Sequence, residues 1–168
     1  MHDELTIVDI RKMQEEIDDR ELRLRPKLLE DVKTARAFGD LSENFEYKAA
    51  KEAKNKNESR IRYLRRMIAT AVIIDPAADS AADTVGLFDR VELFMEDENE
   101  TETVTFVTTM RQDPRRGLVS KESPVGRAVI GHRVGERVFI HVGEGGYWVR
   151  IQAVEKGVDD DTLSINAY

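Results

Sequence analysis

The sequence has no cysteine, only 4 prolines and few aromatic residues, which make up 7% of its 168 positions. The lack of cysteine excludes disulfides and thiolate metal sites, and it permits a reducing compartment without proving one. The longest apolar run, around residues 71–74, is far too short to span a bilayer. No basic segment followed by an apolar one marks the N-terminus, so we expect a cytoplasmic protein that does not enter a membrane.

Charge, by contrast, is abundant. Charged residues make up 35% of the chain, the formal net charge is −7, and the N-terminal part of the chain holds most of these residues. Such a composition is typical of a solvated, elongated helical segment. The net negative charge argues against binding duplex nucleic acid through bulk positive charge, but it leaves room for local basic patches.

Apolar residues recur at helical spacing from about residue 7 to residue 37 and again from residue 47 to residue 72. Between the two stripes, Gly39 suits the C-terminus of one helix, and Asp40 follows as a natural N-cap of the next. Helices joined by so short a turn pack antiparallel. The sequence therefore predicts a long helical hairpin.

Pairing across a turn near residue 40 places Leu28 against Ala53 and Val32 against Ala49, so that large residues face small ones near the tip. Polar residues interrupt the stripes and predict a weak seam further from the tip; these are Arg20, Glu21, Lys54 and Asn57.

The second half of the chain changes to an apolar period of two after residues 76–84, which are proline-led, small or acidic and read as a linker. Alternating residues flank turns at Glu96–Glu100 and Gly143–Gly146, as in two β-hairpins, and Ser123-Pro124 opens a short helix that ends before Gly131. The fold class is therefore α+β: a helical hairpin over 1–75, a linker over 76–84 and an antiparallel sheet with a short helix over 85–168. The tail from Gly157 onward has no assignable place.

The aromatic, arginine and histidine residues lead to further predictions. The aromatic residues are expected to fill the small sheet core; these are Phe88, Phe94, Phe106, Phe139, Tyr147 and Trp148. Arg111, Arg115 and Arg116 surround Pro114 and read as an exposed basic loop. The histidines, His2, His132 and His141, have no ligand spacing with one another.

Asp40 and Glu43 lie three residues apart at the junction of the two long helices, and two interpretations compete for them. On spacing alone they form a capping box, in which Glu43 reaches back to the start of the helix. Alternatively, the two carboxylates are oxygen ligands for Mg²⁺, which is usually held by one or two protein carboxylates together with phosphate oxygens. Two ligands make only half a site, so a partner holding a metal and a phosphodiester would have to complete it.

A family resemblance bears on this choice. The run from Gly39 to Tyr47, continued by Lys48-Ala49-Ala50-Lys51-Glu52, resembles the tip of the Gre family of bacterial transcript cleavage factors. The run from Ser123 to Gly131, followed by Val134-Gly135, is similar to the signature of that family's C-terminal domain. The motifs occur in the family's order, with the hairpin and linker between them, so the resemblance covers nearly all of residues 5–155.

The resemblance implies that an N-terminal antiparallel coiled coil enters the secondary channel of RNA polymerase and that an FKBP-like C-terminal domain docks at the channel's rim. It implies that Asp40 and Glu43 reach the active centre of a backtracked complex, where they help to bind a second Mg²⁺ and position or activate the attacking water. Polymerase then cuts its own extruded RNA and regains a 3′ end in register. The chain itself is expected to be a monomer with no nuclease activity and no stably bound Mg²⁺.

Basic residues near the tip match the family's RNA-contacting patch. The resemblance assigns contact with extruded RNA to Arg36, Lys48 and Lys51, in a cluster that also holds Lys54 and Lys56. The alternative is a solvated charged face balanced by Glu46, Glu52 and Glu58.

The chain also departs from the family. Phe45 stands where the family usually has alanine, and it either contacts polymerase or packs on its own helix. Asp9 replaces a common glycine and Arg20 a customary leucine, changes that bear on the packing at the base of the hairpin.

Three functions follow for testing. The first is a transcript cleavage factor, and the second is a channel-binding regulator or inhibitor of polymerase without cleavage activity. The third, from another class, is a peptidyl-prolyl isomerase or chaperone acting through the C-terminal domain, where no residue specifies a proline pocket.

Overall fold

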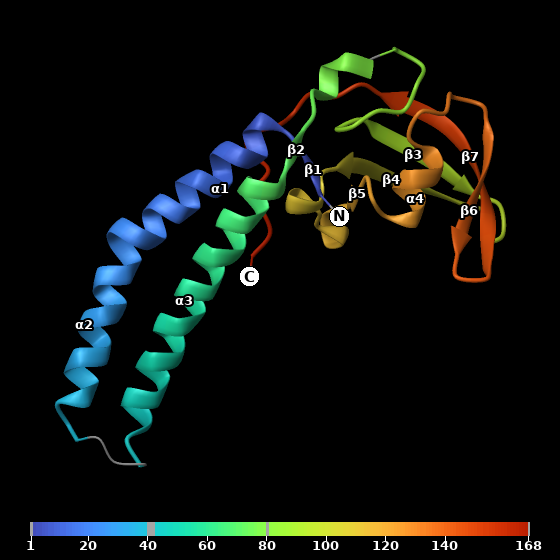
Figure 1. The fold of residues 1–168 in the computed structure, drawn as a ribbon. Coiled ribbons are helices and arrows are strands. Elements are labelled where there is room, and N and C mark those ends of the chain that lie inside the picture. Colours follow the sequence, from blue (N-terminus) through green and yellow to red (C-terminus); the bar gives the residue numbers. More distant parts are fainter. Residues whose placement is uncertain (1, 40–42, 80, 168) are drawn as a thin grey trace. The chain divides into compact units, whose positions relative to one another are not determined.

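The structure, a computed structural model, describes residues 2–39, 43–79 and 81–167. It divides into two compact units, one formed by residues 10–71 and the other by residues 1–9 and 72–167. Figure 1 shows helices in the first and a curled sheet with short helices in the second. The α+β class expected from the sequence is confirmed.

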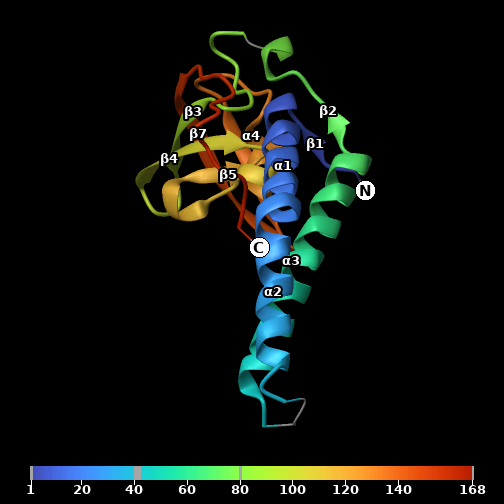
Figure 2. The same ribbon diagram turned by 90° about the vertical axis from the view of Figure 1, so that its left-hand side faces the viewer.

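The first unit is the predicted helical hairpin. Its first arm is a continuous helical run of α1 (Ile7–Asp19), a π-helical segment (Arg20–Leu24) and α2 (Arg25–Arg36), and its second arm is α3 (Phe45–Thr70). Figures 1 and 2 show the second arm running antiparallel beside the first. The apolar residues buried in this unit follow the predicted stripes; they are Met13, Ile17, Ala35, Ile61 and Leu64.

The π-helical segment ends two residues before Pro26, which is the second residue of α2. Proline has no backbone N–H, and its ring clashes with the carbonyl four residues earlier in a regular helix. Here the amide of Arg25 donates to the carbonyl of Arg20, five residues back. We attribute the wider turn to Pro26, because an inserted residue is one of the few ways in which a long helix accommodates such a break.

Two of the polar residues that interrupt the stripes, Arg20 and Asn57, pair with each other across the hairpin, as Glu16 and Arg60 do. The buried guanidinium of Arg60 donates to Glu16 through two nitrogens, at 2.6 and 3.1 Å, and Arg20 donates to Glu16 at 2.8 Å and to Asn57 at 2.9 Å. Burial raises the pKa of Glu16, but the hydrogen bonds and charges of Arg60 and Arg20 outweigh it and hold the pKa below its ordinary value. The seam therefore depends on an ionised Glu16.

The expected pairing near the tip is wrong. Ala49 and Ala53 are exposed, and the inward face of α3 passes through residues 47, 50, 54 and 57 instead. Arg25 donates to both carboxylate oxygens of Glu58, at 2.7 and 2.9 Å. Arg36 meets Tyr47 and Arg25 meets Glu58, each two residues further along α3 than the pairing of Leu28 with Ala53 implies.

The second unit is built on a five-stranded sheet with the order β5-β4-β3-β7-β6. Its strands are β3 (Arg90–Met95), β4 (Glu100–Val107), β5 (Leu118–Ser120), β6 (Arg137–Val142) and β7 (Gly145–Glu155). Both predicted hairpins are present, as β3–β4 and β6–β7. The sheet is mixed rather than purely antiparallel, because β5 pairs parallel to β4.

A small parallel pair lies outside this sheet. β1 (Glu4–Leu5) pairs with β2 (Val72–Ile73), so that the chain segments just before and just after the hairpin are joined. Short 3₁₀ turns complete the unit at Pro76–Asp79, Thr109–Arg111 and Pro114–Arg116.

The predicted short helix is α4 (Pro124–Val129), whose N-cap Ser123 accepts a hydrogen bond from the amide of Gly126 at 3.0 Å. A Cβ at Gly126 would lie 2.5 Å from the carbonyl oxygen of Ser120, so only glycine fits this close approach of backbones. The core beside α4 is aliphatic with one buried ring; it holds Val85, Val91, Leu93, Phe106, Val129, Val138, Ile140, Val149 and Ile151.

Not all of the aromatic residues fill this core. Phe106 and Phe88 are buried, but Trp148 is 38% exposed. It pairs across the strands with Phe139, whose ring meets it edge-on at 5.2 Å, and the guanidinium of Arg137 lies 3.9 Å from its ring centre. Phe139 and Trp148 were expected in the core, but side chains alternate between the two faces of a sheet. Val138 and Ile140 point inward, which leaves Phe139 and Trp148 on the other face.

Arg111 is fully buried, so the expected exposed basic loop is wrong at this residue; Arg115 and Arg116 are exposed. The Nε of Arg111 lies 2.8 Å from an oxygen of the buried Asp9, a charge contact without hydrogen-bond alignment. The Nη2 of Arg111 pairs with Asp159. Asp9 also accepts hydrogen bonds from the Thr6 amide and the Thr108 hydroxyl, both at 3.0 Å. Asp9, the departure from glycine, is thus the counter-ion of Arg111.

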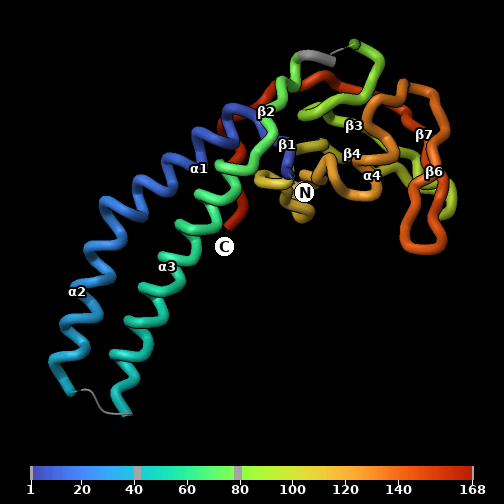
Figure 3. The backbone as a smooth tube through the Cα atoms, viewed as in Figure 1, coloured from blue at the N-terminus to red at the C-terminus, as the bar shows by residue number. Residues whose placement is uncertain are grey.

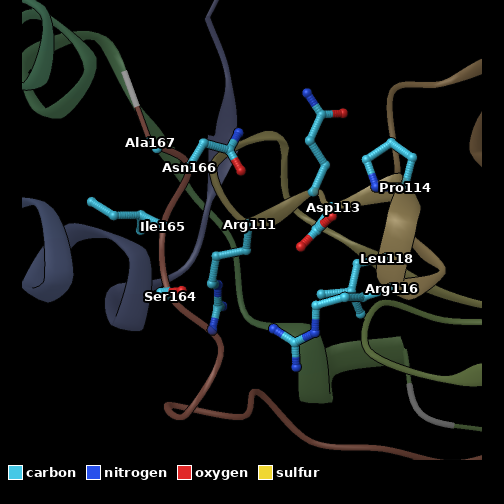
Figure 4. Close-up of a pocket in the computed structure, with 10 residues that line it drawn as sticks. Arg111, Asp113, Pro114, Arg116, Leu118, Ser164, Ile165, Asn166 and Ala167 are labelled. Atoms are coloured by element: carbon cyan, nitrogen blue, oxygen red, sulfur yellow. The ribbon is translucent and has the colours of Figure 1, made fainter.

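The tail, which had no assignable place, packs within the second unit. Asn166 donates from its backbone to the carbonyl of Met110 at 2.7 Å and from its side chain to that of Thr109 at 2.8 Å. Leu163 joins a small core with Phe88, Val107 and Leu118. Figure 4 shows the tail residues beside Arg111 and the turn at Pro114. The tail and the N-terminal segment therefore hold the same arginine.

Candidate functional site at the hairpin tip

The tip of the hairpin is organised by Asn44, a residue that the sequence interpretation passed over. Its side-chain oxygen accepts a hydrogen bond from the amide of Tyr47 at 3.0 Å, which makes it the N-cap of α3. Its side-chain nitrogen donates to the carbonyls of Ala35, at 3.0 Å, and Gly39, at 2.6 Å. One side chain thus begins the second arm and closes the first. Figure 3 traces the two arms, α1 with α2 and then α3, as a continuous tube on either side of the tip.

Gly39 ends the first arm with a φ of 115°, which favours glycine, as predicted. Asp40 lies outside the residues that the structure describes, so its two interpretations stay predictions. Glu43 is described: it is exposed, in a turn that precedes the N-cap, and its carboxylate accepts no hydrogen bond from the described residues.

The capping-box interpretation of Glu43 is therefore not supported by the helix start. A capping-box glutamate occupies the third position inside a helix, whereas Glu43 precedes Asn44 and α3 begins at Phe45. The sequence analysis considered only Asp40 as a cap, although asparagine is as well suited to this position as aspartate, and in the structure Asn44 caps α3. A reciprocal box of this kind is present instead at Thr6 and Asp9, where each backbone amide donates to the other's side chain.

Two phenylalanine rings are exposed beside Glu43. Phe45 is 75% exposed and Phe38 is 73% exposed. Most of the Phe45 ring thus faces solvent, and from its own helix the ammonium of Lys48 lies 5.6 Å from the centre of the ring. Together with Glu43, Asn44 and Glu46, the two rings line a hollow of about 590 Å³.

The basic residues assigned to RNA contact are exposed near the same end of the hairpin. Arg36 donates to the Tyr47 hydroxyl at 2.8 Å, with its guanidinium 5.2 Å from the centre of that ring. Lys48 and Lys51 are three residues apart on α3, which makes them neighbours on the helix surface. The structure thus brings Arg36 and Lys48 close to the aromatic tip, with Lys51 one turn further along.

One of the proposed balancing acids is engaged elsewhere. Hydrogen bonds from Arg25 lower the pKa of Glu58, with smaller contributions from the charges of Arg62 and Lys54, so this carboxylate is paired chiefly with the first arm. Glu46 and Glu52 are exposed on α3. The alternative of a fully balanced charged face is weakened to that extent.

No cluster of three or more acidic, histidine or cysteine side chains suited to a metal occurs among the described residues. His132 contacts Glu136 at 2.6 Å, and His141 meets the ring of Phe139 edge-on. In the described part of the chain, no helix has the length and apolar character needed to cross a membrane.

The fold and the tip define a class of protein: a long helical hairpin with an exposed acidic and aromatic tip, attached to a small α+β unit. The profile described as transcription elongation factor, N-terminal, matches residues 4–73, and that described as transcription elongation factor, GreA/GreB, C-terminal, matches residues 80–156. The chain belongs to the GreA/GreB family of transcription elongation factors.

Curated relatives agree. The chain is 38% identical over 144 residues to transcription elongation factor GreA of Limosilactobacillus fermentum, covering 86% of this chain and 90% of the relative. It is 40% identical over 145 residues to GreA of Sinorhizobium medicae, covering 86% and 91%. Among solved structures, GreA factor homolog 1 of Thermus thermophilus is 23% identical with a TM-score of 0.42, covering 93% of this chain and 100% of that one.

Proposed function

We propose that this elongation factor stimulates RNA cleavage by RNA polymerase, entering the secondary channel with its hairpin and presenting Asp40 and Glu43 to the active centre of a backtracked complex. The observation that carries the proposal is the position of Glu43, exposed at the tip and ahead of the Asn44 cap. A carboxylate that caps no helix and pairs with no described residue is available to a partner.

The tip suits a shared Mg²⁺ site and not a resident one. An exposed carboxylate is the oxygen donor that Mg²⁺ prefers, but one or two such groups hold the ion only together with further ligands from elsewhere. Glu43 and Asp40 would supply the protein's share, and polymerase and the RNA phosphate the rest. In such a site Mg²⁺ lowers the pKa of bound water and stabilises the charge that develops on phosphate oxygens.

The chain's own residues have three tasks in this account. Glu43 and Asp40 donate oxygens and orient the attacking water. Asn44 holds the start of α3 to the end of the first arm, next to Glu43. Arg36, Lys48 and Lys51 contact the phosphates of the extruded RNA, which needs no sequence readout. Cleavage at the polymerase active centre would give a new 3′ end in register and rescue arrested transcription, with the factor a monomer of the cytoplasm and not itself an enzyme.

The second unit has the complementary role of docking at the channel's rim, through a domain that we take to be FKBP-like. Its exposed Trp148 side offers an apolar contact surface framed by Arg137. Isomerase activity would instead require a proline-binding pocket, and a protease-coupled isomerisation assay on the full chain tests for it directly.

The test is the length of RNA over time in a stalled, backtracked elongation complex with Mg²⁺. Shortening is expected with the native protein, and loss of it with Asp40→Ala or Glu43→Ala, while Glu52→Ala, an exposed acid further along α3, keeps it. Protein and RNA without polymerase should show no shortening. Binding to polymerase without any shortening would make the chain a channel-binding regulator and overturn the cleavage proposal.

A further inference from the structure

The proposed cleavage mechanism, which uses Asp40 and Glu43, assigns no role to the two exposed rings of the tip, Phe38 and Phe45. Each leaves about three quarters of its surface in water, at 73% and 75%, so neither gives the hairpin much of the stability that a buried ring supplies. Both line the hollow of about 590 Å³ beside Glu43. Rings placed in this way suit a flat apolar ligand.

Cations accompany the aromatic faces of the tip. Lys48 lies 5.6 Å from the ring centre of Phe45, and Arg36 lies 5.2 Å from that of Tyr47. Alternation of rings and cations is typical of surfaces that bind single-stranded nucleic acid, where bases stack on the rings and phosphates meet the cations. An apolar protein surface would match the rings alone, whereas a nucleotide matches rings and cations together.

The acids of the hollow decide which part of the nucleotide enters it. Glu43 and Glu46 line the hollow and would repel a phosphate that no Mg²⁺ accompanies. The oxygens of Glu46, which has no task in the cleavage proposal, can accept hydrogen bonds from the amino and imino groups of a base edge, which point away from the phosphate. Lys48, on the helix surface behind Phe45, is placed to meet the backbone.

We propose that Phe38 and Phe45 form an aromatic clamp that stacks an unpaired nucleobase of the extruded RNA 3′ segment. The clamp rests on the proposed function, because entry of the hairpin into polymerase is what brings the RNA to the tip. It gives the tip a hold on the strand that is separate from the carboxylates of Asp40 and Glu43, and it makes cleavage sensitive to the presence of a base at that position.

Photochemical cross-linking tests the contact without requiring cleavage. Backtracked complexes carrying 5-iodouridine in the extruded segment are bound to the full chain with Ca²⁺ in place of Mg²⁺, irradiated, and the modified peptide is identified by mass spectrometry. Cross-links are expected on the peptides that hold Phe38 or Phe45, falling by about ten-fold in the Phe38→Leu, Phe45→Leu double variant. Leu22→Ala, which removes an 80% exposed apolar side chain elsewhere on the hairpin, should leave them unchanged.

Cross-links confined to polymerase, or to the peptides of Lys51 or Arg36, would overturn the clamp. So would loss of affinity of the double variant for polymerase that carries no extruded RNA, because the rings would then bind polymerase itself.

The rate of RNA cleavage provides a second test of the clamp. Native protein should cleave an extruded segment with a base about ten-fold faster than one that is abasic at the stacked position, and Phe45→Leu should remove this difference. An equal rate on both substrates contradicts the clamp. If cleavage depends on Glu43 but no tip cross-link forms, only the clamp fails; if the cross-link forms but cleavage never occurs, the cleavage proposal fails and the clamp stands.

Discussion

Asn44 determines where α3 begins, and so keeps Glu43 outside the helix. We expect Asn44→Ala to destabilise the hairpin by about 1 kcal/mol, the usual cost of losing an N-cap, and to speed amide exchange at Tyr47, whose N–H loses its acceptor. Asn44→Asp keeps that acceptor and loses the donors to Ala35 and Gly39. It should preserve protection of Tyr47, and equal exchange in the two variants would contradict the capping role.

Arg111 is the other residue on which much local structure depends, since it is buried between Asp9 and Asp159. Arg111→Met should destabilise the protein by about 3–5 kcal/mol, because it leaves buried carboxylates without their counter-ion. Urea unfolding followed by tryptophan fluorescence measures the change. Arg115→Met, on the exposed neighbouring turn, is the matched control and should lie within about 0.5 kcal/mol of the native protein.

At the scale of single residues, the sequence could not identify these two positions. An arginine beside proline and glycine reads as exposed unless its partners are known, and Asp9 and Asp159 lie near opposite ends of the chain. Likewise Asp40 and Asn44 are both good caps, and only the folded turn distinguishes them.

Among the elements, the hairpin carries the clearest pH dependence, through Glu16. Its pKa is lowered in the folded protein, so its contribution to stability is complete above the ordinary glutamate pKa and is lost as the pH falls through the lowered value. The free energy of unfolding should therefore decrease on acidification below about pH 4.5, and Glu16→Gln should flatten that decrease while lowering stability at neutral pH.

Helical content followed against urea at several pH values provides the measurement. Glu15→Gln is the control, because Glu15 is exposed and lies 3.8 Å from Arg11 in a surface pair. If the free energy of unfolding of Glu16→Gln decreased on acidification as steeply as that of the native protein, Glu16 would not be the source of this pH dependence.

Elements were more predictable than their registers. Periods of 3.6 and 2 identified both long helical arms and both β-hairpins, and Ser123-Pro124 identified α4. The register of the arms near the tip was not predicted, because the apolar stripes do not specify which residues face one another; in the structure Arg36 meets Tyr47 and Arg25 meets Glu58. The strand β5 was missed because at Leu118–Ser120 it is too short to show an alternation.

At the scale of the whole molecule, the sequence motifs at the tip and around α4 were enough to indicate the family, which the profiles and relatives establish. The cleavage mechanism is the part that remains a proposal. Its central claim is that the tip acids are ligands for an ion that polymerase holds, and a merely structural role for them predicts a different response to Mg²⁺.

The most direct test is the single-turnover rate of RNA cleavage in a backtracked complex as a function of Mg²⁺ concentration, with saturating native protein, Glu43→Gln or the control Glu52→Gln. The account predicts that Glu43→Gln raises the Mg²⁺ concentration for half-maximal rate by roughly ten-fold or more, with partial rescue at high Mg²⁺, because one oxygen ligand is weakened. The control should follow the native curve. A Glu43→Gln protein with the native Mg²⁺ dependence and the native rate would contradict the claim.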